Sequence, residues 1–166
     1  MEKHTENEWL TRVRESEDLG ALKSLVEDAE IQARASDGGS VRLLWDVCQI
    51  PDFRSISNSE HSDLLGTIYN YLHEKGQIPQ EWLAQQINRI DKTSGDIDAL
   101  SKRLAYIRTW TYVSQRKDWL EDQSHWRDET RAVEDRLSDA LHVALTQRFV
   151  DRRTSILMRR LKQKES

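Results

Sequence analysis

Apolar residues recur every three or four positions along most of the chain, a pattern typical of amphipathic helices. Residues 8–35 fit two short helices, with Ser16 as the expected N-cap of the second. The stretch 36–40, "SDGGS", interrupts the pattern and predicts a break, after which Ser40 caps the next helix. The apolar positions of the two short helices are Trp9, Leu10 and Val13, followed by Leu19, Leu22, Leu25, Val26 and Ala29.

The next two helices are bounded by proline and glycine. A helix over residues 41–49 must stop before Pro51, because the residue preceding a proline avoids the helical region. The pattern restarts at Ser57 or Ser59, and Gly76 occupies a C-cap position. The apolar stripe of this second helix is predicted to contain Leu64, Leu65, Ile68, Tyr71 and Leu72.

Three more helices follow towards the C-terminus. Pro79 suits a first helical turn, and residues 91–96, "DKTSGD", form the next loop. The last helix is expected to run to about Arg160. The apolar positions of the three helices are Trp82, Leu83, Ile87 and Ile90; then Ile97, Leu100, Leu104, Ile107 and Thr111; and finally Trp126, Val133, Leu137, Ala140, Leu141 and Ala144.

These patterns define the fold class. No segment alternates apolar and polar residues for long enough to predict a strand, and no repeat of 20–50 residues occurs. We therefore predict an all-α protein, a single bundle-like domain of six or seven helices with a long C-terminal helix. Within it, residues 1–40 form an acidic N-terminal helical segment and residues 41–166 the main helical region.

Composition narrows the class of protein. The 166 residues are 37% apolar and 33% charged, which is typical of a soluble, helix-rich intracellular protein with a real core. The acidic N-terminus does not resemble a secretory signal, and no apolar run approaches a membrane span. The single cysteine cannot form an internal disulfide, which fits a reducing compartment. We expect a cytoplasmic protein without a membrane partner.

The net charge of −4 hides an asymmetry. Residues 1–40 contain ten acids and five bases, whereas residues 148–164 contain seven bases and one acid, Asp151. A basic end on an acidic body suggests contact with a polyanion or with an acidic protein surface.

Candidate catalytic residues are few. Cys48 is the only thiol, but its apolar neighbours raise a thiol pKa, so we interpret it as a small core residue near a helix end. The five histidines lack metal-ligand spacing. Asp135 and Asp139 share a helix face, but Arg131 and Arg136 nearby favour a salt-bridged surface. No glycine precedes a lysine, so phosphate-binding loops are missing, and we predict no enzymatic activity, cofactor or metal.

The basic C-terminal segment is the remaining candidate site. If it is helical, Arg148, Arg152 and Arg159 share one side and Arg153 and Arg160 another, with an apolar stripe of Leu145, Phe149, Ile156 and Leu157 between them. Such a helix could contact a nucleic-acid backbone. Alternatively, its cations suit the negative end of the helix dipole while the apolar stripe docks on the body. The candidate nucleic-acid-binding residues are Arg148, Arg152, Arg153, Arg159, Arg160 and Lys162.

Three segments of the sequence resemble a known protein family. They are "VRLLWDVCQIPDFR" (41–54), "GDIDALSKRLAYIRTWTYVSQRKDWL" (95–120) and "EDRLSDALHVALTQRFVDRRTSILMRRL" (134–161). They resemble the C-terminal region of bacterial superfamily-two DExH helicases related to the mitochondrial degradosome RNA helicase. In that family, two RecA-like motor domains bind ATP, and a helical C-terminal region packs against them and helps to enclose the strand.

The resemblance covers about residues 41–161 and includes no catalytic motif. The chain lacks both motor domains, so the resemblance implies a fragment or a stand-alone copy of the accessory region. The expected function is a non-catalytic module that contacts single-stranded RNA or DNA and the helicase motor domains. The alternative is a helical protein–protein interaction module with no nucleic-acid role.

Overall fold

The computed structural model describes residues 19–53 and 58–165, and every regular element in these ranges is a helix. Residues 19–26 are helical, and six further helices follow. They are α2 (Ala29–Arg34), α3 (Gly38–Cys48), α4 (Asn58–Lys75), α5 (Gln80–Ile90), α6 (Ile97–Ser114) and α7 (Gln123–Glu165). The all-α prediction with a long C-terminal helix is confirmed. The predicted helix with apolar positions from Leu19 to Ala29 is wrong at its end, because Asp28 caps a new helix that starts at Ala29. The predicted positions of Trp9, Leu10, Val13 and Ser16 lie outside the described residues.

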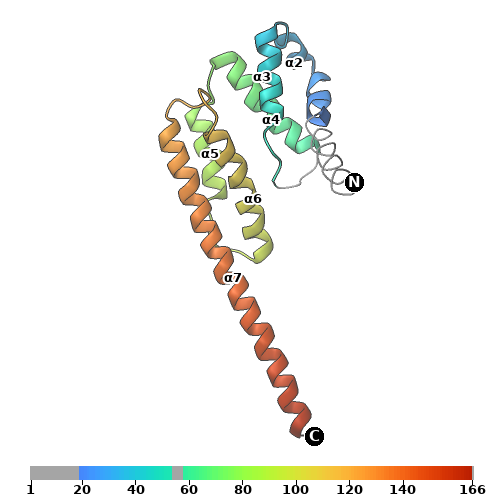
Figure 1. Cartoon of the computed structure of the whole chain (residues 1–166), viewed down its shortest axis with the longest axis vertical. Helices are drawn as coiled ribbons and strands as arrows, with labels where there is room; N and C mark the ends of the chain where they lie inside the picture. Colours follow the sequence, from blue (N-terminus) through green and yellow to red (C-terminus); the bar gives the residue numbers. More distant parts are fainter. Residues whose placement is uncertain (1–18, 54–57, 166) are drawn as a thin grey trace, which may run out of the picture.

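The helices form two neighbouring groups. Figure 1 shows α2, α3 and α4 together at one end, and α5, α6 and α7 side by side, with α7 extending far beyond the rest. The groups meet where Thr109 of α6 donates a hydrogen bond to the carbonyl of Pro51 (3.2 Å). Trp82 of α5 bridges them as well, with its ring 5.2 Å from Tyr71 and 5.5 Å from Trp110. One continuous apolar core therefore serves both groups.

The start of α3 differs from the prediction. The predicted break exists but spans residues 35–37, and the helix begins at Gly38. Gly38, Gly39 and Ser40 therefore form its first turn, and the predicted Ser40 cap is wrong. Asp37 is the N-cap: its backbone is extended and its carboxylate accepts a hydrogen bond from the Ser40 N–H (2.7 Å), which lowers the pKa of Asp37.

Ser40 instead anchors α4. Its carbonyl accepts a hydrogen bond from the Tyr69 hydroxyl (3.2 Å), and its hydroxyl lies 3.2 Å from Nε2 of His73. Both partners belong to α4, so the first turn of α3 is tied to a second helix as well as to its own cap. Ser40 is buried in these contacts, whereas a residue that only caps a helix at the protein surface stays in contact with water.

Three predicted boundaries hold, at Gly76, at Pro79 and at residues 91–96. Gly76 follows α4 with φ 77°, and its N–H bonds to the Leu72 carbonyl (2.9 Å), the left-handed C-cap that glycine favours. Pro79 directly precedes α5, and Asp96 ends the loop of residues 91–96 by capping α6 through the Ala99 N–H (2.8 Å). The last helix is longer than expected, reaching Glu165 instead of about Arg160.

The neighbours of the side chains considered for catalysis indicate structural roles. Cys48 is the last residue of α3 and is 2% exposed within the core, in agreement with its interpretation as a core residue. Among residues 19–53 and 58–165, no three His, Cys, Asp or Glu side chains gather as a metal would require. Arg136 donates to both carboxylate oxygens of Asp91 (3.2 and 2.8 Å), which raises the pKa of Arg136.

None of the described helices combines the length and the apolar character needed to cross a membrane.

Candidate nucleic-acid interface

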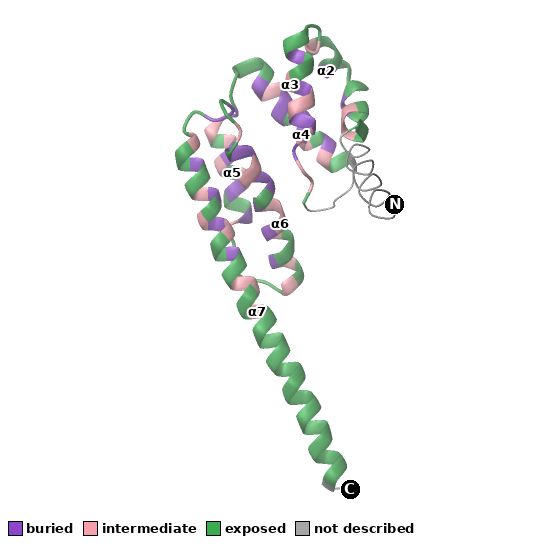
Figure 2. Ribbon diagram, in the orientation of Figure 1, coloured by how far each residue is buried: buried purple, intermediate pink, exposed green. Residues whose placement is uncertain are grey.

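The first half of α7 is docked on the body. Trp126, Val133 and Leu137 are buried, and these positions repeat at helical spacing along the side that faces α6. Thr130 lies on the same side, with its hydroxyl 3.4 Å from that of Ser114. Figure 2 shows these buried positions only on the upper part of α7, which is therefore part of the core.

The second half leaves the body because its docking face becomes polar. The register that buries Val133 and Leu137 continues, beyond Ala144, through Gln147 and Asp151. These two side chains hydrogen-bond to each other on the surface (3.0 Å) and offer nothing apolar to bury. α6 is also only 18 residues long, so it can cover less than half of the 43 residues of α7.

The alternative in which the C-terminal apolar stripe docks on the body is therefore wrong. Figure 2 shows the lower part of α7 exposed on every side, and in Figure 1 it passes no other helix. The four stripe residues remain 48–66% exposed. They are Leu145, Phe149, Ile156 and Leu157. We call residues 145–165 the projecting half of α7.

All six candidate cations lie on the projecting half and are exposed. The helix separates them into two sets. Arg152, Arg159 and Lys162 follow Arg148 by 4, 11 and 14 positions. At 100° per residue, each of the three lies within about 40° of Arg148 around the helix axis, so the four share one side. We call them the four-cation row, and its length is ~21 Å at the helical rise. Arg153 and Arg160 point to another side, as the sequence predicted.

The charges of the six candidate cations have no ion-pair partner in the part of the chain that the structure describes. Asp151, the acid next to Arg152, is hydrogen-bonded to Gln147. The row therefore presents four positive charges to solvent, where a negatively charged ligand can approach from outside. Lys162 also lies in the last turn of α7, where the negative end of the helix dipole favours a cation.

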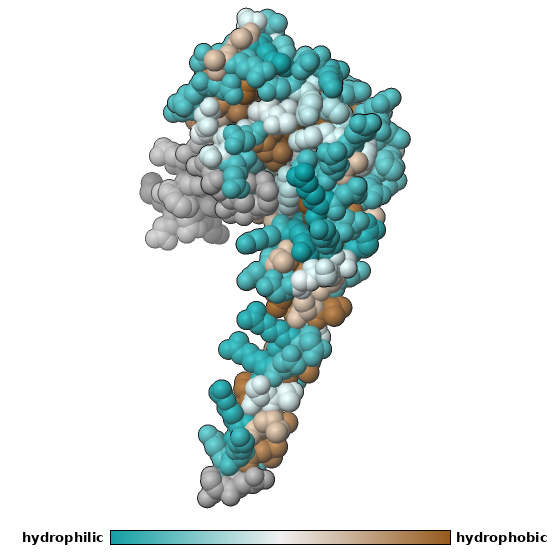
Figure 3. All heavy atoms as spheres, turned by 180° about the vertical axis from the view of Figure 1, so that it is seen from behind, coloured by the Kyte–Doolittle hydropathy of each residue, from teal (hydrophilic) through white to brown (hydrophobic). Residues whose placement is uncertain are grey.

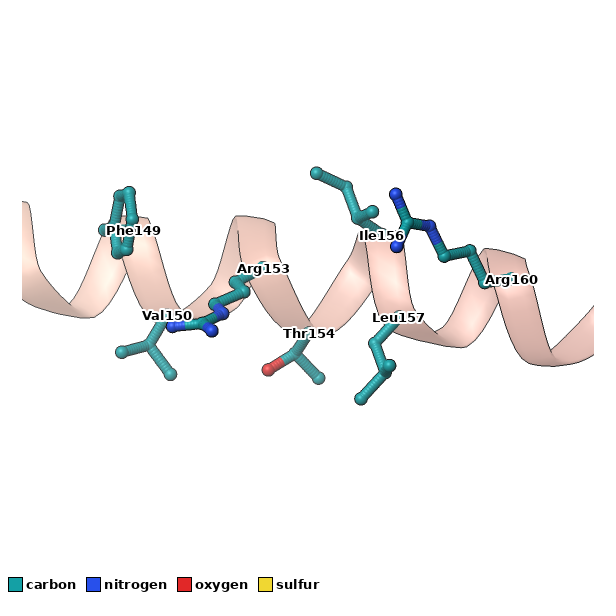
Figure 4. Close-up of a pocket in the computed structure, with 7 residues that line it drawn as sticks. All are labelled: Phe149, Val150, Arg153, Thr154, Ile156, Leu157 and Arg160. Atoms are coloured by element: carbon teal, nitrogen blue, oxygen red, sulfur yellow. The ribbon is translucent and has the colours of Figure 1, made fainter.

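A shallow hollow lies between the side chains of the projecting half (Figure 4). Arg153 lies across the helix, with Phe149 on one side of it and Val150 on the other. Seven residues line the hollow, all from α7, so it is an open depression on one helix and not an enclosed cavity. The lining residues are Phe149, Val150, Arg153, Thr154, Ile156, Leu157 and Arg160.

The apolar residues form two rows where the sequence predicted one stripe. Phe149 and Ile156 belong to one row, whereas Leu157 pairs with Val150 on the other side of the hollow. Val150 is absent from the predicted stripe, although it lies seven positions before Leu157, a spacing that indicates a shared side of the helix. Figure 3 shows apolar side chains distributed among polar ones along the projecting half.

The side chains of this arrangement are of kinds that suit binding. The projecting half offers guanidinium groups, one amine, and apolar side chains, which suit phosphate contacts and partner packing. In three comparisons with known proteins, the chain matches no protein-family model, no curated protein and no solved structure.

Proposed function

We propose that the chain is a non-catalytic accessory module of an ATP-dependent RNA or DNA helicase, and that it contacts single-stranded nucleic acid through the four-cation row. The observation that carries the nucleic-acid part is the exposed row of Arg148, Arg152, Arg159 and Lys162, without acidic partners in the described chain, on a helix that extends away from the core. The proposed link to a helicase rests on the three sequence segments within residues 41–161. The helicase motor domains are the proposed protein partner.

The row fits a phosphate backbone better than it fits base recognition. Four cations spread over ~21 Å along one side of a helix can each meet a phosphate of a flexible single strand. Contacts of this kind position a strand without reading its sequence. We therefore expect binding that varies little with sequence and weakens steeply with added salt.

The test is a titration of fluorescently labelled single-stranded RNA with the full chain at several salt concentrations. Arg152→Gln/Arg159→Gln removes two charges of the row, and glutamine keeps a helix propensity close to that of arginine. If both residues contact phosphates, the slope of log affinity against log salt becomes shallower by up to ~1.4, or ~0.7 for each lost contact.

The matched control is Arg127→Gln/Arg131→Gln. These two arginines are also exposed and also on α7, but they lie on its docked half. The control should keep the wild-type slope. Equal slopes for all three folded proteins would exclude the row from the nucleic-acid contact.

A second function is favoured by one specific observation. The projecting half exposes large apolar side chains beside its cations, which is expected of a helical protein–protein interaction module. Under this alternative the wild-type chain has no measurable affinity for single-stranded RNA even at low salt. The same titration therefore separates the two functions.

A further inference from the structure

The projecting half of α7 is more apolar than an isolated surface helix should be. Most long helices gain their stability from packing an apolar face, and contiguous exposed apolar surface commonly marks an interaction site. Eight large apolar side chains on or just before this half are 48–67% exposed. They are Val143, Leu145, Phe149, Val150, Ile156, Leu157, Met158 and Leu161.

The face around the hollow has a regular geometry. Phe149 and Ile156 are seven positions apart, and so are Val150 and Leu157. Arg153 and Arg160 repeat the same interval, and at 100° per residue their positions around the helix fall between these two apolar rows. A spacing of seven residues is the interval at which one helix packs along another. We call this surface, the two apolar rows with the two arginines between them, the heptad face.

We propose that the heptad face binds an acidic amphipathic helix of a partner protein. Apolar side chains of that helix would cover the two rows, and carboxylates at a spacing of seven would meet Arg153 and Arg160. The positive charge of Arg153 and Arg160 is the reason to expect an acidic partner helix. Any surface that covers both rows also removes the two guanidinium groups from water, and an unpaired buried charge is strongly unfavourable. A carboxylate can satisfy a guanidinium with two parallel hydrogen bonds.

The same reasoning argues against a second copy of this chain. Two heptad faces laid against each other would place Arg153 and Arg160 opposite like charges, and none of the residues that line the hollow is an acid. A lipid surface is also a poor match, because helices that lie in a membrane carry their cations outside the apolar face. In α7 the arginines divide the apolar face in two.

The heptad face lies on a different side of α7 from the four-cation row, so this proposal does not rest on the proposed function. A nucleic-acid strand that follows Arg148 and Arg159 would leave at least one of the two apolar rows uncovered. Nucleic acid and a partner helix could therefore occupy the projecting half together.

The test uses the full chain and two labelled peptides that copy residues 143–164. One peptide has the natural sequence, and the other, the acidic peptide, carries Arg153→Glu, Arg160→Glu and Lys164→Glu. Both keep the same apolar rows, so they differ only in charge. By fluorescence anisotropy, we expect the full chain to bind the acidic peptide at least roughly tenfold more tightly than the natural peptide.

A charge reversal in the full chain completes the design. Arg153→Glu/Arg160→Glu should reverse the preference, so that the natural peptide binds more tightly. Arg127→Glu/Arg131→Glu, on the docked half, should retain the wild-type preference. Circular dichroism confirms folding, which these exposed positions should not disturb.

Three results would overturn the proposal. They are equal or absent binding of the two peptides, an unchanged preference in Arg153→Glu/Arg160→Glu, and stronger retention of the chain by anionic lipid vesicles than by the acidic peptide. Concentration-dependent self-association of the wild-type chain in sedimentation, lost on Arg153→Glu/Arg160→Glu, would identify a second copy as the occupant and would also contradict it. None of these measurements contains nucleic acid, so their failure and that of the proposed function are distinguishable.

Discussion

A matched pair of leucines on α7 tests whether its second half truly stands apart from the body. Leu137 lies in the docked half and is 0% exposed, whereas Leu157 lies in the projecting half and is 58% exposed. Both are changed from leucine to alanine within the same helix. Alanine is at least as good a helix former as leucine, so helix propensity does not favour either wild-type residue.

The expected free energies differ widely. Leu137→Ala removes a fully buried side chain and leaves a cavity between α6 and α7, which typically costs about 3 kcal/mol, within a range of ~2–5 kcal/mol. In a domain of this size, each 1 kcal/mol lowers the melting temperature by roughly 2–4 °C, so a fall of about 6–12 °C is expected. Leu157→Ala removes a side chain that is mostly in water and should change the free energy of unfolding by no more than about 0.5 kcal/mol.

The assay is thermal unfolding followed by circular dichroism at two protein concentrations. A fall in melting temperature for Leu157→Ala as large as that for Leu137→Ala would refute the reasoning, because residue 157 would then be buried in the chain on its own. If that large fall appeared only at the higher concentration, the projecting half would be buried by self-association.

Three further predictions concern the body. The Ser40 N–H lowers the pKa of Asp37 below its usual 3.8. The cap therefore contributes stability that is present above pH 3.8 and is lost as pH falls through the lowered pKa. The difference in melting temperature between the wild type and Asp37→Ala should shrink between about neutral pH and about pH 3. Gly76→Ala places a Cβ at φ 77° and should cost about 1 kcal/mol in chemical denaturation, whereas Gly38→Ala, at a right-handed position in α3, should not destabilise. Cys48→Ser puts a hydroxyl in the apolar core and should lower the melting temperature, while RNA affinity measured well below that temperature stays within about twofold; a lost affinity with unchanged melting would contradict the core role.

Much of the helical order could be predicted because its signals are local. Gly76 and Pro79 each impose a backbone constraint that holds in any tertiary context, and the observed boundaries follow them. The start of α3 was missed because Asp37 and Ser40 are both good capping residues. What decides between them is the position of α4, since Tyr69 and His73 engage Ser40.

The projecting half was harder to predict for a related reason. Leu137 and Leu157 both belong to apolar residues at helical spacing, although 20 positions place them on nearly opposite sides of α7, and the spacing alone does not show which side packs on another helix. The relevant signal was length: α6 ends after 18 residues, and Gln147 and Asp151 then fall on the docking side of α7. The separation of the cations into two sides was predictable from their spacing alone.

Hydrogen exchange along α7, with and without single-stranded RNA, tests the central claim most directly. In the free chain, amides of the docked half should be strongly protected and those of residues 146–164 weakly protected, because helices without tertiary packing open readily. With RNA, we expect protection to rise in residues 146–164, while α3 and α4 remain unchanged. Binding that leaves residues 146–164 as exposed as before, or that protects α3 and α4 instead, would contradict the assignment of the projecting half as the nucleic-acid contact.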